Sequence, residues 1–155
     1  MNILVVFYSR TGMTRKVGET IARHLKADKE EIYDTNNRKG FFGYLSAGMD
    51  AFLKRETEIF NYSKDPANYD LVIIGTPIWS LGISPAIRTY VMRNKSKFKK
   101  VAFFCSHSGS PGKQAFDDLE HLCGKEPIAV LEIGEHELMT GGSYEAIAEF
   151  AEEIA

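Results

Sequence analysis

The stretch that decides the fold is residues 3–14, which read ILVVFYSRTGMT. The first half, Ile3 to Tyr8, is apolar throughout, a pattern typical of a strand buried on both faces of a parallel sheet. A loop with hydroxyl side chains and one glycine follows, and a helical pattern begins at about Met13. A helix N-terminus presents unpaired N–H groups and the positive end of the macrodipole, and both favour a phosphate. The stretch therefore predicts a strand, a short turn and a helix N-terminus that together cradle a phosphate.

Strands and helices alternate along the rest of the chain. Further strands are predicted at residues 30–33, 69–75, 100–105 and 128–131, the first of them at an edge of the sheet. Further helices are predicted at residues 45–52 and from Pro85, Pro111 and Ser143, and loops at 34–42, 76–82 and 106–110. This alternation is typical of an α/β fold with right-handed crossovers. We expect residues 1–155 to form a single domain around a five-stranded parallel sheet.

The composition is that of a globular protein without a strong charge. The 155 residues carry a formal net charge of −2, which gives no reason to expect a nucleic acid or an acidic membrane as a partner. The apolar runs are far shorter than the ~20 residues that span a bilayer, and no signal peptide is evident. The two cysteines, Cys105 and Cys123, form no CxxC pair and are expected to be reduced and buried. We therefore expect a cytoplasmic protein.

Three predicted strands end in unusual loops, at residues 9–14, 76–82 and 106–110. In an open parallel sheet, ligands bind beyond the carboxyl ends of the strands, so these loops converge if the first, third and fourth strands are neighbours. The second loop offers Trp79, whose planar ring suits stacking on a planar ligand, and the third offers His107 and several hydroxyls. The chain has neither a lysine-bearing P-loop nor a GxGxxG fingerprint. The cradle therefore suits a small monophosphate.

Together the three loops resemble those of the flavodoxin family. Ser9-x-Thr11-Gly12-x-Thr14 resembles its FMN phosphate loop, Thr76-Pro77-Ile78-Trp79 resembles its second flavin loop, and Ser106-His107-Ser108-Gly109 lies where the third is expected. The resemblance covers nearly the whole chain. It implies a three-layer α/β/α flavodoxin-like fold with parallel strands in the order 2-1-3-4-5 and FMN at the switch between the first and third strands.

The resemblance also implies which residues bind FMN. The phosphate loop comprises Ser9, Arg10, Thr11, Gly12, Met13 and Thr14. One face of the flavin would lie against Thr76, Pro77, Ile78, Trp79 and Ser80. The other side and the polar edge would meet Ser106, His107, Ser108 and Gly109. In the family, a backbone carbonyl near residues 80–82 bonds to flavin N5.

Three features depart from the family pattern. Arg10 puts a cation in the phosphate loop, where it either pairs with the phosphate or points to water. The third loop has no tyrosine to cover the outer flavin face, so His107 either stacks there or leaves that face open to a substrate or nicotinamide. The net charge of −2 is also weaker than the acidity that steers carrier flavodoxins to basic partners.

These features leave three functional hypotheses. The first is a carrier that moves electrons through non-covalently bound FMN to redox partner proteins or a small-molecule electron acceptor. The second is an FMN-dependent NAD(P)H oxidoreductase acting on quinones or similar acceptors, and the third is a flavin-free interaction module. Outside the loops, His24, His121 and His136 are predicted at the surface without metal-ligand spacing. The pair Asp117 and Asp118 is predicted to lie on a solvated helix face.

Overall fold

The computed structural model describes residues 1–35, 40–80 and 82–155. The strands are β1 (Ile3–Tyr8), β2 (Asp28–Ile32), β3 (Leu71–Trp79), β4 (Gly82–Ile83), β5 (Lys100–His107) and β6 (Val130–Gly134). The helices are α1 (Met13–Leu25), α2 (Gly40–Phe52), α3 (Pro85–Asn94), α4 (Lys113–Cys123), α5 (Glu135–Thr140) and α6 (Ser143–Ile154). In the described part of the chain, no helix has the length and apolar character needed to cross a bilayer.

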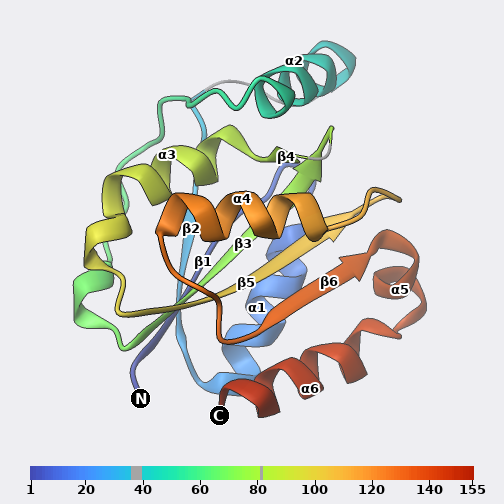
Figure 1. Cartoon of the computed structure of the whole chain (residues 1–155). Coiled ribbons are helices and arrows are strands. Elements are labelled where there is room, and N and C mark those ends of the chain that lie inside the picture. The colour runs from blue at the N-terminus through green and yellow to red at the C-terminus, as the bar shows by residue number, and fades with distance from the viewer. Residues whose placement is uncertain (36–39, 81) are drawn as a thin grey trace.

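The parallel strands follow the predicted order. β2, β1, β3, β5 and β6 lie side by side in the sheet, which is 2-1-3-4-5 when the parallel strands alone are numbered (Figure 1). The predicted α/β/α fold is therefore confirmed. β4 was not predicted from the sequence. It pairs antiparallel with the end of β3 and sets Trp79 opposite Gly82. The predicted loop at residues 76–82 is thus mostly a short β-hairpin.

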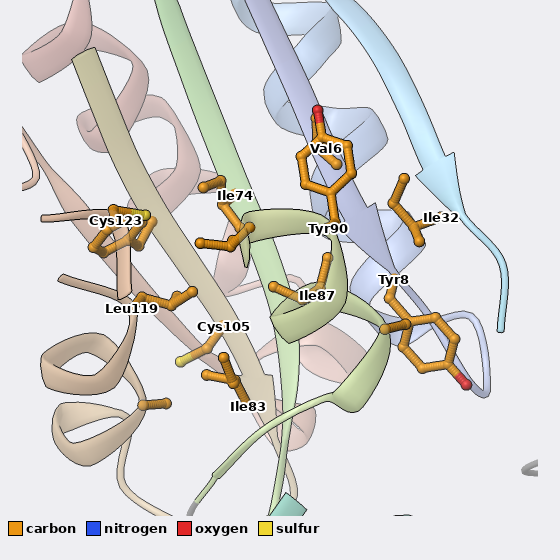
Figure 2. Close-up of a cluster of buried hydrophobic side chains, with 14 of the residues drawn as sticks. Val6, Tyr8, Ile32, Ile74, Ile83, Ile87, Tyr90, Cys105, Leu119 and Cys123 are labelled. Carbon is orange, nitrogen blue, oxygen red and sulfur yellow. The ribbon is translucent and has the colours of Figure 1, made fainter. Parts of the chain in front are cut away.

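Helices cover both faces of the sheet. α1 and α6 pack on one face through Val17, Ile21 and Phe150. α3 and α4 pack on the other face, where Figure 2 shows Ile87 of α3 and Leu119 of α4 within one buried cluster. β1 contributes alternate side chains to both clusters, which explains why it is apolar at every position.

Several element boundaries differ from the predictions. β2 begins at Asp28 rather than at residue 30, and β6 covers Val130–Gly134 rather than 128–131. The fourth helix begins at Lys113 rather than at Pro111, and the Gly112 N–H just before it donates to Oε1 of Glu132 in β6 at 2.9 Å. The predicted loop at 34–42 includes residues 36–39, which lie outside the described residues, and its end forms the start of α2.

A buried ion pair joins α3 to α4. Arg88 donates from Nη2 to Oδ2 of Asp118, and the two side chains are only 6% and 10% exposed. Lys54, which follows α2, lies with its Nζ 3.7 Å from Oδ1 of the same carboxylate. The predicted solvated face is therefore wrong for Asp118, although Asp117 is exposed and pairs with Lys113. Adjacent positions on a helix point about 100° apart, so one of two neighbouring carboxylates can face a packed helix.

Candidate functional site at the carboxyl edge of the sheet

The candidate site lies where the carboxyl ends of β1, β3 and β5 meet. The register places Phe7 of β1 beside Gly75 of β3, and Pro77 of β3 beside Ser106 of β5. The three loops predicted to converge do so around one cavity of about 740 Å³. That volume lies within the range of about 300–1,000 Å³ found for small-molecule and cofactor sites.

The first loop forms a tight turn into α1. The Gly12 N–H donates to Oγ of Ser9 at 3.0 Å, and Gly12 has a φ of 101°, a left-handed value that glycine adopts without strain. Ser9 and Gly12 thus build the turn, whereas the cavity is lined by Arg10, Thr11, Met13 and Thr14. The first turn of α1 carries no acidic residue. Because Met13 and Thr14 of this turn line the cavity, the partial positive charge of the helix N-terminus lies at this end of the cavity.

A hydroxyl pair ties the first loop to the third. Oγ1 of Thr14 and Oγ of Ser106 lie 2.7 Å apart, and both residues are buried. Each hydroxyl can donate one hydrogen and accept others. The pair therefore fixes the spacing between the two loops while both residues still line the cavity.

The cations near the first loop take different directions. Arg15 turns away from the cavity toward β2, where its Nη2 lies 2.7 Å from Oε1 of Glu31. The hydrogen bond to Glu31 raises the pKa of the Arg15 guanidinium above its ordinary value. Arg10 instead lines the cavity. Arg10 is therefore within the cavity, and its pairing with a ligand phosphate stays a prediction.

The second loop forms one wall of the cavity and contains Trp79, which is only 7% exposed. Pro77, Ile78, Trp79 and Ser80 line the cavity. The Trp79 ring packs edge-on against Tyr8, with ring centroids 5.5 Å apart and planes at 89°. Thr76 is fully buried, and its Oγ1 accepts a hydrogen bond from the Ser84 N–H at 2.9 Å. Thr76 therefore holds the hairpin to the start of α3 rather than lining the cavity.

The third loop is organised by His107. Its Nδ1 accepts a hydrogen bond from the Gly109 N–H at 3.0 Å, and its Nε2 lies 3.0 Å from Oε1 of Glu132. A ring nitrogen that accepts from an N–H carries no proton, so we assign the proton to Nε2, which donates to Glu132. His107 also lines the cavity, together with Ser106, Ser108 and Ser110. His107 thus holds the third loop in place, and its contact with a flavin stays a prediction.

The cavity is also lined by residues that sequence reasoning missed. Leu45, Gly48 and Met49 of α2 line it, as does Glu135 at the start of α5. Leu45 and Met49 are 50% and 56% exposed, whereas Ala47 on the opposite side of the helix is buried. The spacing of the apolar residues predicted the helix but not the direction of its apolar face. Figure 1 shows α2 beyond the end of the sheet, near the β3–β4 hairpin, rather than flat on a sheet face.

The sequence matches a protein-family model described as flavodoxin over residues 2–154. The chain belongs to the flavodoxin family. Flavodoxins are FMN-binding flavoproteins, so family membership confirms the predicted family and the predicted cofactor, FMN. The residues present fit this cofactor, because a hydroxyl-lined helix N-terminus suits a phosphate and the wall that holds Trp79 suits a flat ring.

Solved flavodoxin-like structures share the fold at low sequence identity. A flavoprotein from Lactobacillus acidophilus, solved in complex with FMN, is 24% identical with a TM-score of 0.74, covering 90% of this chain and 97% of that chain. The two-electron reduced flavodoxin of Megasphaera elsdenii is 16% identical with a TM-score of 0.61, covering 99% of each chain. A Streptococcus flavodoxin is 18% identical with a TM-score of 0.60, covering 99% of this chain and 97% of that chain. The comparison with curated proteins found no match.

Proposed function

We propose that this flavodoxin-family chain binds FMN non-covalently in the cavity at the carboxyl edge of the sheet and transfers electrons through it. One observation carries the proposal. The N-terminus of α1 and the wall containing Trp79 face the same cavity of about 740 Å³. A phosphate group and a flat ring system can therefore be held at once by one ligand.

Each loop has a distinct part in holding the cofactor. Thr11, Thr14 and the N–H groups of the first turn of α1 hold the phosphate, and Arg10 adds a charge-assisted contact. Trp79 supports the isoalloxazine ring, and His107 borders the ring while its bond to Gly109 keeps the third loop in place. FMN supplies the redox chemistry when bound, and the protein binds it, orients it and excludes water from one side.

The test is a titration of the apoprotein with FMN and with riboflavin, which lacks the phosphate. Trp79 is the single tryptophan in the sequence, so its fluorescence reports on the site directly. We expect FMN to quench this fluorescence and to bind about 100-fold more tightly than riboflavin, because the phosphate contacts are charge-assisted. Absence of quenching by FMN would overturn the proposal. Equal affinities for FMN and riboflavin would contradict the assignment of a phosphate site at the first loop.

A pair of variants localises the phosphate contact. Thr11→Val removes a hydroxyl from the cradle and is expected to weaken FMN binding about 5- to 10-fold while leaving riboflavin affinity unchanged. Thr35→Val is the matched control, because Thr35 donates its hydroxyl to the Glu58 carbonyl at 3.2 Å rather than lining the cavity. Equal losses in the two variants would contradict the assignment of Thr11.

The electron acceptor is either a redox partner protein or a small molecule. A net charge of −2 gives little electrostatic steering toward a basic protein partner. The apolar cavity wall formed by α2 favours a small molecule, as in an FMN-dependent NAD(P)H oxidoreductase. Anaerobic mixing with NADPH and a quinone distinguishes the two functions, since rapid turnover indicates the enzyme and its absence indicates the carrier. The cytoplasmic location stays a prediction.

A further inference from the structure

The apolar side of α2 is exposed to the cavity rather than to the core. Leu45 and Met49 lie one helical turn apart and are 50% and 56% exposed, yet both line the cavity. The other side of the helix is anchored, with Ala47 buried in the cluster beneath α3. Exposing large apolar side chains to water is unfavourable, and apolar residues gathered in a concave site are typical of a binding surface.

Contacts at three points hold α2 in this position. At Gly48, an added Cβ would lie 2.9 Å from Oγ of Ser80, so the helix and the hairpin tip approach closely. After the helix, Lys54 lies 3.7 Å from the buried carboxylate of Asp118. Farther along, Thr57 and Thr89 exchange two hydrogen bonds, with the Thr57 N–H donating at 3.0 Å and the Thr89 hydroxyl donating at 2.7 Å. The apolar wall is therefore a built part of the site.

The two ends of the cavity differ in chemistry. The end at α1 carries hydroxyls and Arg10, the one lysine or arginine among the described lining residues. The wall formed by α2 contributes Leu45, Gly48 and Met49 and no charged group. A charged ligand placed against this wall would lose hydration without gaining a partner there. The wall therefore suits an uncharged and flat apolar molecule.

We propose that the α2 wall is the subsite for an uncharged aromatic electron acceptor of the quinone class, bound between Leu45 and Met49 on one side and the flavin on the other. This inference rests on the proposed binding of FMN. In the transfer, the quinone gains two electrons and two protons and becomes the hydroquinone, and two-electron-reduced FMN loses the same two electrons and two protons. Hydride transfer from a donor of the reduced pyridine nucleotide class, together with one proton from solvent, would return FMN to its two-electron-reduced form, so the electrons and protons balance over each cycle.

The test measures binding of 2-methyl-1,4-naphthoquinone to the oxidised, FMN-loaded protein by calorimetry. We expect saturable binding in the wild type and a dissociation constant raised about 3- to 10-fold in Leu45→Gln and in Met49→Gln, because each loses part of an apolar contact. Leu53→Gln is the matched control. Leu53 lies just beyond α2, is 45% exposed and does not line the cavity, so its dissociation constant should stay within about twofold of wild type.

Two further measurements separate the subsite from the cofactor site. The FMN affinity of Leu45→Gln and Met49→Gln should stay within about threefold of wild type, since these residues contact the acceptor. The sulfonated analogue 1,4-naphthoquinone-2-sulfonate should bind about 10-fold more weakly than the methyl compound, because its charge meets an apolar wall that offers it no partner.

The measurements distinguish a failure of the acceptor subsite from a failure of the proposed FMN binding. A wild-type protein that binds FMN but not the naphthoquinone, or variants that match wild type in quinone affinity, would overturn the subsite alone. A loss of FMN affinity in the two variants would assign α2 to the cofactor site and also overturn the subsite. A wild-type protein that does not bind FMN would overturn the proposed function together with this inference.

Discussion

At the scale of single residues, glycine at position 75 is required by the ring of Phe104. Gly75 lies in β3 between Phe7 of β1 and Phe104 of β5. A Cβ added at Gly75 would lie 1.9 Å from Cζ of Phe104, well inside van der Waals contact. Because Phe104 is fully buried, its ring has no free space into which to move.

Gly75→Ala is therefore expected to lower the free energy of unfolding by about 3 kcal/mol, at the upper end of the usual cost of overpacking. Urea denaturation measures this change through the transition midpoint at constant slope. Gly142→Ala is the control, because an added Cβ there meets its first neighbour at 3.9 Å and the φ of −65° is one that alanine adopts freely. A loss in Gly75→Ala no larger than in this control would contradict the steric explanation.

Trp79 is the residue whose loss should affect cofactor binding most directly. Trp79→Ala is expected to weaken FMN binding by about 1–3 kcal/mol, because the alanine removes the aromatic surface against which the flavin ring would lie. Titration of the apoprotein followed by flavin fluorescence measures the affinity. Tyr8→Leu serves as a second variant, since it removes the edge-on support at 5.5 Å and should cause a smaller loss. Unchanged affinity in Trp79→Ala would refute its role.

At the scale of elements, the ion pair between Arg88 and Asp118 connects α3 and α4 beneath the end of α2. Removing one member leaves the other charge buried without its partner, and this usually costs more than the pair itself contributes. Arg88→Met is expected to lower the free energy of unfolding by about 2–4 kcal/mol, with Lys54 at 3.7 Å compensating in part. Thermal or urea denaturation measures the loss.

The adjacent carboxylate provides the control for this pair. Asp117→Asn breaks an ion pair with Lys113 whose side chains are 62% and 83% exposed, so the expected change is below about 0.5 kcal/mol. The double variant Arg88→Met/Asp118→Leu should recover at least half of the loss, because an apolar pair replaces a single buried charge. A double variant less stable than Arg88→Met would contradict this account.

At the scale of the whole molecule, the buried thiols link stability to alkaline pH. Burial raises the pKa of Cys123 from its ordinary value of 9.0 to about 12, and it raises the pKa of Cys105 as well. Above pH 9 the unfolded chain loses these thiol protons while the folded chain keeps them. The unfolded state then binds fewer protons, so the free energy of unfolding falls as the pH rises, and for Cys123 the fall continues to about pH 12.

We therefore expect the midpoint of urea denaturation, under reducing conditions, to fall between pH 8 and pH 10. In Cys123→Ala the slope of stability against pH should become shallower, even though the variant itself is less stable. The slope is thus the measurement that separates the titration from the packing loss. An unchanged slope in both Cys123→Ala and Cys105→Ala would exclude the thiols as its cause.

Much of the fold and the site follows from local sequence patterns. A strand buried on both faces must be apolar at each position, so β1 and the central part of β3 are recognisable without the structure. A turn into a helix needs a glycine and capping or phosphate-binding groups at neighbouring positions, so the loop at residues 9–14 is also readable. These features depend on residues a few positions apart, and the order of the parallel strands followed once the three loops had been compared with a known family.

Other features depend on which distant segments meet, and only the tertiary structure decided them. The spacing of Leu45 and Met49 predicts a helix, but the same spacing suits a core face or a cavity wall. The burial of Asp118 depends on Arg88, 30 positions earlier in the chain, and the entry of Glu135 into the cavity depends on where β6 ends. The sequence by itself determined the turn from β1 into α1 and predicted a phosphate cradle there, since that chemistry is local. The cavity wall formed by α2 was decided by packing between segments far apart in the chain.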